Sequence, residues 1–184
     1  MKILKLSMVL LIICAIVAGI LGVVNFVTAD TIAARQAEKT AKAYAAVLPS
    51  EGYTQLELDA EQFPKMTISE ANGGEGYVVM STFSGSQGNI TMVTGVDNEL
   101  RCTGISIISH SETSGLGANA ASSAEVGVNF RSQFVGQGAD IALKKAGGEI
   151  DALTGATITS NAVTQAAAAA ISAVEAIMQG GAAA

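Results

Sequence analysis

Four hydroxyl side chains between residues 151 and 160 are the residues whose types are best suited to chemistry. Thr154, Thr157, Thr159 and Ser160 lie at the start of a long alanine-rich segment with helical periodicity. The first N–H groups of a helix have no intrahelical partner, and the helix dipole favours negative charge beside them. The pattern therefore predicts either an ordinary helix cap, where serine and threonine are common, or a site for one phosphate group.

The sequence lacks the signatures of several other sites. The hydroxyl-rich segment has no Walker A lysine, so it does not predict triphosphate binding. There is no Gly-x-Gly-x-x-Gly for NAD(H) and no Cys-x-x-Cys for an iron–sulfur cluster, and His110 is the only histidine, which excludes a multi-histidine metal site. Ser109 or Ser160 could nominally join His110 and Asp151 in a hydrolase triad, but the Gly-x-Ser-x-Gly elbow is absent.

A second segment with candidate functional residues lies about forty positions earlier. It reads Ser109-His110-Ser111-Glu112-Thr113-Ser114-Gly115-Leu116-Gly117 and turns through two glycines after an apolar run. A lone histidine is more often a hydrogen-bonded surface or core residue than a ligand. For His110 both roles, structural residue and ligand-binding residue, stay open.

Strands and turns are predicted to position this loop. Tyr77–Phe83, Ile90–Val96 and Cys102–Ile108 alternate in the manner of strands and are separated by turn residues, which predicts an antiparallel meander. One further strand is expected near Gln55–Leu58, in an otherwise acidic and irregular stretch from Glu51 to Glu75.

Two helices and two short strands are predicted in the C-terminal half. Ser122 and Glu125 match a capping box, which predicts an amphipathic helix over Ser123–Phe134 that Gly136 and Gly138 stop. Short strands are expected around Gly147-Gly148, and a final helix with an apolar stripe is expected to end at Gly180-Gly181. The strands would be Ile141–Leu143 and Ile150–Leu153, the helix Thr159–Met178, and its stripe Val163, Ala167, Ile171, Val174 and Met178.

The N-terminus predicts a membrane anchor. Leu6–Val27 has 22 residues without a charge. As a helix it would span about 33 Å, enough for a hydrocarbon core of about 30 Å. The alternative is a cleaved signal peptide with a Val27-Thr28-Ala29 site. Lys2 and Lys5 precede the apolar run, which favours a cytoplasmic N-terminus and a domain outside the cytoplasm.

The helix is expected to continue beyond the membrane and to lead into an acidic domain. The segment over Asp30–Val47 is rich in alanine, and Pro49 ends it. It is either a stalk or the first helix that packs in the domain, and both can hold. All 16 acidic residues follow Thr28, and the chain carries a net charge of −6, so nucleic acid is not an expected partner.

The two functional segments together resemble a known family. Asp151-x-x-Thr154-Gly155-Ala156-Thr157 resembles the flavinylation motif of the FMN-binding domain in ion-translocating redox complexes. The His110 loop is similar to the family's His-x-Glu-Thr-Pro-Gly-Leu-Gly signature, except that Ser114 stands where proline is usual. The serine leaves the turn less fixed in φ than proline would.

The resemblance implies covalent FMN. In the family the last threonine of the motif carries FMN through a phosphoester bond, which implies Thr157 as the attachment residue here. A separate flavin transferase makes that bond and recognises the motif, which implies Asp151, Gly155 and Ala156 as residues that it reads. Candidate cofactor-binding residues are further Thr154, Thr159, Ser160, His110, Glu112, Thr113, Gly115, Leu116 and Gly117. The aromatic residues Tyr77, Phe83, Phe130 and Phe134 either line the flavin ring or pack in the core.

The fold class expected from these observations is α+β, with an N-terminal transmembrane helix followed by an antiparallel-sheet domain with packed helices. The expected parts are the anchor (1–28), the juxtamembrane stalk (29–49), the FMN-binding domain (50–179) and a tail (180–184). The chain is most similar in pattern to the G subunits of Rnf-type ferredoxin:NAD oxidoreductases.

The resemblance implies an electron carrier rather than a complete enzyme. The A, B, C, D and E subunits of such a complex, the flavin transferase and membrane lipid would be its partners, in the cytoplasmic membrane. The alternatives are the C subunit of the sodium-translocating NADH:quinone reductase, and a non-redox membrane-anchored binding or assembly module.

Overall fold

The computed structural model describes residues 2–180 of the chain, with the side chains of residues 2–4 and 6 left aside. The chain divides into two compact units, Met1–Thr40 and Ala41–Ala184. Of the predicted tail (180–184), Gly180 is the last residue of a helix, and residues 181–184 lie outside the described residues.

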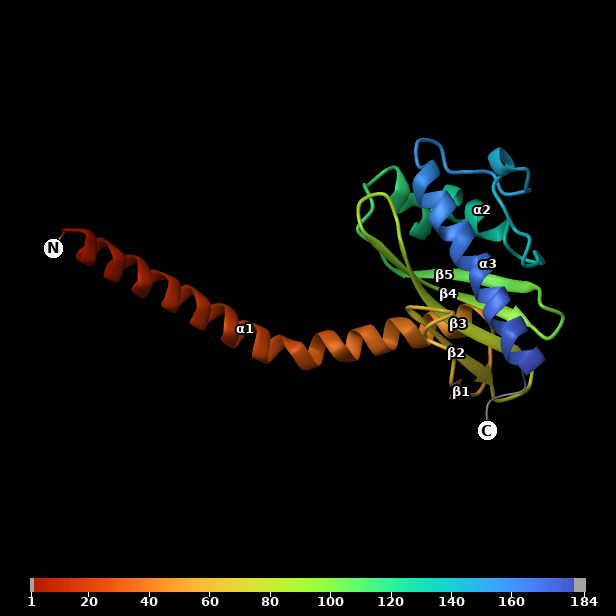
Figure 1. Ribbon diagram of the computed structural model, residues 1–184, viewed down its shortest axis with the longest axis horizontal. Coiled ribbons are helices and arrows are strands. Elements are labelled where there is room, and N and C mark those ends of the chain that lie inside the picture. Colours follow the sequence, from red (N-terminus) through yellow and green to blue (C-terminus); the bar gives the residue numbers. More distant parts are fainter. Residues whose placement is uncertain (1, 181–184) are drawn as a thin grey trace. The chain divides into compact units, whose positions relative to one another are not determined.

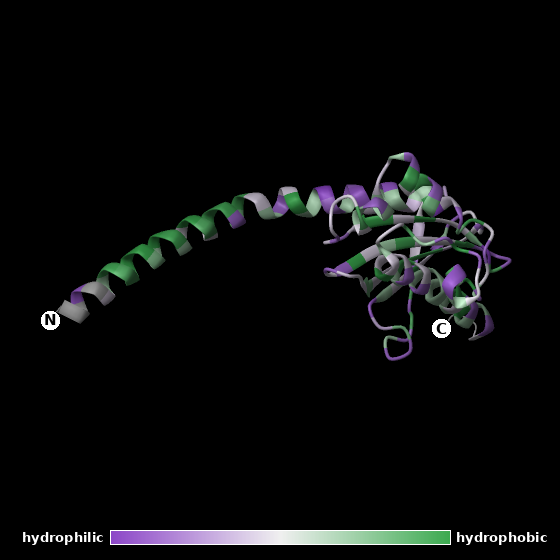
Figure 2. Ribbon diagram, turned by 90° about the horizontal axis from the view of Figure 1, so that it is seen from above, coloured by the Kyte–Doolittle hydropathy of each residue, from purple (hydrophilic) through white to green (hydrophobic). Residues whose placement is uncertain are grey.

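The first unit is the greater part of one long helix, α1 (Lys2–Val47). Figure 2 colours its N-terminal part green, for apolar residues, and its later part increasingly purple and white. The segment from Ser7 is long and apolar enough to cross a membrane, and its apolar side chains are exposed, as the sequence predicted for an anchor. Helix α3 (Thr157–Gly180) is also long and apolar enough, but half of it is buried, so it is a core helix.

The second unit contains a five-stranded antiparallel sheet (Figure 1). The strands pair in sequence order, and β3, β4 and β5 confirm the predicted meander. Their bounds are β1 (Tyr53–Leu56), β2 (Met66–Ala71), β3 (Gly76–Ser84), β4 (Asn89–Asp97) and β5 (Cys102–Ser109). The pairings Ser84↔Asn89 and Thr91↔Ser109 place the β3–β4 turn and the end of β5 at the same end of the sheet.

The prediction of one strand between Glu51 and Glu75 was wrong. That stretch contains two strands, β1 and β2, and β2 pairs with β3 along Met66–Glu70. The alternation in Met66–Ala71 is short and breaks at Ser69-Glu70, where two polar residues follow one another. This segment forms a strand because it pairs with β3, which satisfies its backbone hydrogen-bonding groups. Its local sequence pattern alone does not determine this conformation.

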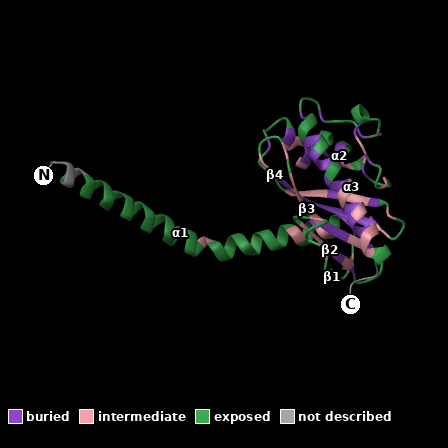
Figure 3. Cartoon of the chain, in the orientation of Figure 1, coloured by how far each residue is buried: buried purple, intermediate pink, exposed green. Residues whose placement is uncertain are grey.

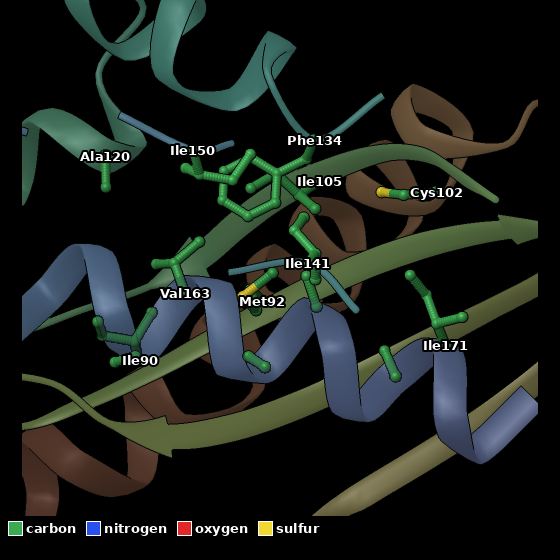
Figure 4. Close-up of a cluster of buried hydrophobic side chains, with 14 of the residues drawn as sticks. Ile90, Met92, Cys102, Ile105, Ala120, Phe134, Ile141, Ile150, Val163 and Ile171 are labelled. Carbon is green, nitrogen blue, oxygen red and sulfur yellow. The ribbon is translucent and has the colours of Figure 1, made fainter. Parts of the chain in front are cut away.

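Helix α3 (Thr157–Gly180) packs across one face of the sheet and closes the main core. Its buried face is rich in alanine, and short side chains let a helix approach the strands closely. Figure 4 shows side chains of this core, including Met92, Phe134, Ile150 and Val163. Phe130 and Phe134 are buried there with ring centroids 5.3 Å apart, so they belong to the core and not to the site.

Two details of the predicted final helix need correction. The helix begins at Thr157 rather than Thr159 and includes Gly180, so Gly180 does not stop it within the described residues. Val163, Ala167, Ile171 and Val174 are buried as predicted, but Met178 is 44% exposed because the helix has passed the edge of the core there.

The end of α1 and the following Leu48 pack on part of the other face of the sheet. Ala43, Val47 and Leu48 are buried against β2, β3 and β4, whereas the preceding turns of the helix are exposed (Figure 3). The Thr103 hydroxyl donates a hydrogen bond to the Val47 carbonyl over 2.6 Å. The segment predicted as a stalk therefore also supplies a helix end to the domain core.

The segments between β5 and α3 are short and irregular. They comprise η1 (Gly117–Ala121), α2 (Glu125–Ser132) and η2 (Lys144–Ala146). The predicted strands at 141–143 and 150–153 are absent from the described chain, where one parallel bridge joins Leu143 to Ile150.

The predicted capping box at the start of α2 was also wrong. The N-cap is Ala124, and no side chain caps the helix. The Ser122 hydroxyl instead accepts the Ala124 N–H over 3.1 Å, which is a turn rather than a cap. Arg131 compensates by donating to the carbonyls of Ala120 and Ser122, which ties η1 to α2.

Candidate flavin site

A cavity of about 350 Å³ joins the two segments that the sequence singled out. It lies between the β3–β4 turn, the loop after β5 and the first turn of α3. Its size falls within the range of small-molecule sites, about 300–1,000 Å³. The lining residues are Ser86, Gln87, Glu112, Thr113, Leu116, Gly117, Gly155, Ala156, Thr157, Ile158 and Thr159.

The turn before α3 fixes the direction of the helix start at this cavity. Gly155 has a φ of 71°, a conformation in which a side chain would be strained, and the Ala156 N–H donates to the Leu153 carbonyl over 3.0 Å. The helix then begins at Thr157, so its first unpaired N–H groups lie beside the cavity.

The four hydroxyls of the segment have different surroundings. The buried Ser160 Oγ accepts the Leu153 N–H and donates to the Ala156 carbonyl, each over 2.9 Å, so it braces the turn. The buried Thr159 hydroxyl donates to the Glu112 carboxylate. Thr154 and Thr157 are exposed, and of these two it is Thr157 that lines the cavity.

Glu112 is the charged residue of the cavity, and it is 8% exposed. Its Oε1 accepts the N–H groups of Ser86 and Gln87, over 2.8 and 3.0 Å, and its Oε2 accepts the Thr159 hydroxyl. Burial alone raises the pKa of Glu112, but these hydrogen bonds and the nearby His110 more than offset it, so the pKa of the carboxyl is lowered. The carboxylate is therefore ionised at neutral pH.

Some predicted site residues do not line this cavity. Asp151 and Thr154 face a second groove, of about 420 Å³, that lies beside α2. The Asp151 carboxylate pairs there with the Lys144 ammonium over 2.5 Å. The backbone N–H of Asp151 donates to the side-chain oxygen of Gln133 over 2.7 Å. Ser160 is buried behind the cavity.

His110 and Gly115 stand just outside the cavity and shape the loop. The His110 Nδ1 accepts the Glu112 N–H over 3.3 Å, and Gly115 has a φ of 77°, which favours glycine. His110 thus orients Glu112 rather than contacting the cavity itself. The turn that carries Ser114 in place of proline keeps its shape through the Leu116 N–H, which donates to the Thr113 carbonyl.

Sequence reasoning missed Ser86, Gln87 and Ile158. The β3–β4 turn was predicted as a turn, but nothing in its sequence shows that it meets a loop more than twenty residues away. The one sequence signal for Ile158 is that it directly follows the predicted attachment residue Thr157. Ile158 is 64% exposed, and Leu116, across the cavity, is 44% exposed.

Together these groups suit a phosphate-bearing ligand with an apolar part. The helix start and its N–H groups stabilise an anion, the Thr157 hydroxyl can act as a nucleophile or acceptor, and Leu116 and Ile158 offer apolar surface. The chemistry of these residues therefore fits FMN, which has one phosphate and a flat, largely apolar ring system.

Comparisons with known proteins agree with this class of site. The FMN-binding domain family matches residues 85–172, which include both the Glu112 loop and the first turns of α3. The N-terminal region of RnfG matches residues 1–47, which correspond to α1. The fold and the site thus define an FMN-binding domain joined to an N-terminal apolar helix.

Similar individual proteins identify the group within this family to which the chain belongs. The G subunit of the ion-translocating oxidoreductase complex of Methanosarcina acetivorans is 33% identical over 175 residues, covering 90% of each chain. The G subunit of the Na⁺-translocating ferredoxin:NAD⁺ oxidoreductase complex of Acetobacterium woodii is 34% identical, covering 87% of this chain and 86% of that protein. The G subunit of the proton-translocating ferredoxin:NAD⁺ oxidoreductase complex of Clostridium ljungdahlii is 31% identical and covers 83% and 80%. The chain belongs to the family of G subunits of ion-translocating oxidoreductase complexes.

Proposed function

We propose that the chain carries FMN covalently on Thr157 and passes electrons within a membrane-bound, Rnf-type complex that links ferredoxin and NAD. The observation that carries the proposal is the cavity shared by the Glu112 loop and the start of α3, with the Thr157 hydroxyl on its wall. The relatives named for ferredoxin:NAD⁺ oxidoreductase complexes support the assignment of the electron path.

The hydroxyls of the segment differ in their availability, and this supports Thr157 as the attachment residue. The oxygens of Thr159 and Ser160 are committed to buried hydrogen bonds. Thr154 is exposed but faces the groove beside α2. Thr157 combines exposure with a place on the wall of the cavity at the helix start, where the negative phosphodiester gains about 0.3–1 kcal/mol from the helix dipole.

The attachment is a phosphoryl transfer from FAD, catalysed by a separate flavin transferase with Mg²⁺. The Thr157 Oγ–H bond breaks, a new Oγ–P bond forms, and the phosphoanhydride of FAD breaks so that AMP leaves with the proton. No electron is gained or lost in this step. Thr157 is therefore an acceptor, and the chain needs no catalytic base of its own.

The first part of the motif has a different task. Asp151 and Thr154 lie away from the cavity, on the exposed groove beside α2. A transferase that approaches this groove would contact the acidic residue and the turn without occupying the space that the flavin needs. This separation supports Asp151 as a recognition residue.

FMN supplies one- and two-electron redox chemistry, and the domain residues bind and orient it. Leu116 and Ile158 provide the exposed apolar surface against which the ring system would lie. Solvent exposure at this edge is consistent with a carrier that must exchange electrons with other subunits.

The N-terminal helix would hold the flavin domain at the membrane, with the N-terminus in the cytoplasm and the domain outside. Its apolar segment and the match to the N-terminal region of RnfG support the anchor. The coupling ion belongs to the assembly, since the relatives' names include both sodium and proton translocation.

The proposal is tested by co-expressing variants with a flavin transferase and viewing a denaturing gel under ultraviolet light. Wild type and Thr154→Val should give a fluorescent band, and Thr157→Val should give a dark one. A dark wild-type band would overturn the covalent flavin, and a fluorescent Thr157→Val band would move the attachment site. Assays of ferredoxin-linked NAD reduction against quinone reduction in the purified complex test the electron path.

A further inference from the structure

Glu112 lies where the three segments of the cavity meet, and its carboxylate contacts two of them. It belongs to the loop after β5, it accepts two N–H groups from the β3–β4 turn, and it accepts the Thr159 hydroxyl from the first turn of α3. One side chain therefore connects all three walls.

Two glycines leave room for this carboxylate. A Cβ on Gly85 would overlap Glu112 Oε1, and a Cβ on Gly117 would lie 2.5 Å from both Glu112 Oε2 and Thr159 Oγ1. Neither glycine has a positive φ, so close approach and not backbone conformation requires glycine at these positions. The sequence around the cavity is built to hold the Glu112 side chain in one place.

The β3–β4 turn depends on Glu112 for its connection to the domain. Within the turn the Gly85 N–H donates to the Gly88 carbonyl over 2.7 Å. Among the described hydrogen bonds, those that tie Ser86 and Gln87 to another segment end on Glu112 Oε1. Without this acceptor, two N–H groups at the cavity wall would lose their partner, which leaves the turn free to move away from α3.

We propose that Glu112 is a positioning residue whose ionised carboxylate holds the Ser86–Gln87 turn against the start of α3 and thereby closes the pocket around the flavin on Thr157. The inference rests on the proposed function for its ligand, but the closure itself is a property of the chain without flavin.

The same charge acts on the flavin. Because Glu112 and Thr157 both line the cavity, FMN attached to Thr157 would bring its phosphodiester charge close to the Glu112 carboxylate. A fixed negative charge disfavours a reduced flavin that carries added negative charge, so Glu112 lowers the reduction potential of the bound FMN. Glu112→Gln keeps an oxygen acceptor but removes the charge.

The first test uses amide hydrogen exchange on the full chain expressed without a transferase. Glu112→Ala should exchange the amides of Ser86 and Gln87 at least tenfold faster than wild type, and Glu112→Gln should fall between them. Glu99→Gln is the matched control, because Glu99 is exposed in the turn at the far end of the sheet. Unchanged exchange at Ser86 and Gln87 in Glu112→Ala would overturn the closure.

The second test measures the midpoint potential of the covalent FMN by spectroelectrochemical titration. Glu112→Gln should shift it to more positive values, Glu112→Asp should stay nearer to wild type, and Glu99→Gln should not change it. A wild-type potential in Glu112→Gln would overturn the electrostatic role. If Glu112→Ala does not fold, Thr159→Val removes one partner with little change in shape and should speed exchange at the same two amides.

The two proposals fail in different ways. A wild-type chain without covalent FMN would overturn the flavin site, while the exchange of the unmodified chain would still decide whether Glu112 holds the turn. Covalent FMN on wild type, together with unchanged exchange at Ser86 and Gln87 in the unmodified Glu112→Ala chain, would keep the flavin site and overturn the positioning role.

Discussion

Thr157 and Thr159 lie two residues apart in the first turn of α3, yet they face different surroundings. The side chain of Thr157 is exposed on the cavity wall, whereas Thr159 is buried with its hydroxyl on Glu112. Residues two apart on a helix point in different directions. The availability of Thr157 is thus set by its position in the turn and not by the abundance of hydroxyls.

Ser160→Ala should destabilise the domain. The mutation leaves the buried Leu153 N–H without an acceptor, which costs about 1–3 kcal/mol. Urea unfolding of the full chain in detergent measures the change as a lower midpoint. Thr154→Ala is the control: its exposed side chain predicts a change within about 0.5 kcal/mol, and equal losses in the two variants would contradict the bracing role of Ser160.

Glu112 should make stability depend on acid pH. Since its pKa is lowered in the fold, the folded protein keeps the carboxylate where the unfolded chain already binds a proton. The stabilisation is complete above the unfolded glutamate pKa of about 4.3 and is lost as the pH falls through the folded pKa. Urea midpoints at about pH 5 and about pH 3.5 should therefore differ less in Glu112→Gln than in wild type.

His110 contacts Glu112, so its contribution to the change of the urea midpoint with pH needs a separate control. The ring accepts the Glu112 N–H through Nδ1 over 3.3 Å, so replacing His110 can change the position of Glu112. His110→Asn, combined with Glu112→Gln, separates the two groups. A Glu112→Gln variant with the full wild-type loss in acid would show that the pH dependence arises elsewhere.

At the scale of elements, the sheet is held between two helices that approach it in different ways. Helix α3 uses a face of alanines, while the end of α1 rests on glycines of β4 and β5. A Cβ at Gly95 would lie 2.8 Å from the Val47 carbonyl oxygen, whereas one at Gly104 would lie 3.6 Å from Val47 Cα, an ordinary contact. The two glycines therefore differ in what they tolerate.

Gly95→Ala should destabilise the second unit, because the added methyl would overlap the Thr103 hydroxyl and the Val47 carbonyl to which it donates, at a cost of about 1–3 kcal/mol. Thermal unfolding of the full chain in detergent would show it as a lower Tm. Gly104→Ala is the matched control and should unfold close to wild type. Equal sensitivity at both positions would argue against a close fit specific to Gly95.

The elements that the sequence predicted well are those with strong local patterns. The anchor helix, the three strands from Tyr77 to Ile108 and the final helix have clear periodicity or length, and the structure confirms them. Strand β2 and the segment between Gly138 and Leu153 could not be predicted, because strand pairing and core contacts with α2 and α3 decide their conformation. Local pattern does not carry that information.

In the site, too, the sequence predicted the features with a local pattern but not those that depend on tertiary contacts. The sequence identified both loops, since glycines and hydroxyls at fixed spacing are visible in it. It gave no sign that Glu112 reaches Ser86 and Gln87, or that Asp151 and Thr154 turn away to the groove beside α2. Those relations arise from the β3–β4 turn and the end of β5 meeting at one end of the sheet.

At the scale of the whole molecule, the chain combines an apolar N-terminal helix with a domain that, in the proposed function, carries one redox group. The domain residues bind the ligand, and the helix restricts where it can exchange electrons. Lys2 and Lys5, which precede the apolar segment, predict that the domain lies outside the cytoplasm while the N-terminus stays within it.

Labelling of one introduced cysteine tests this topology without removal of the two native cysteines. Cys14 lies in the apolar helix, and burial raises the pKa of the Cys102 thiol to about 11, so neither reacts readily with a membrane-impermeant maleimide. Glu61→Cys, in an exposed loop, should be labelled in intact cells, and wild type should not. Labelling of Glu61→Cys only after permeabilisation would place the domain in the cytoplasm.

The most direct measurement is the location of FMN on the protein chain by mass spectrometry. Trypsin cleaves after Lys145, and residues 146–184 contain no lysine or arginine, so all four hydroxyls of the segment fall in one peptide that begins at Ala146. From wild type produced with the transferase, that peptide should carry the mass of FMN less one water, with fragment ions that place it on Thr157. An unmodified peptide, or FMN on Thr154, Thr159 or Ser160, would contradict the account.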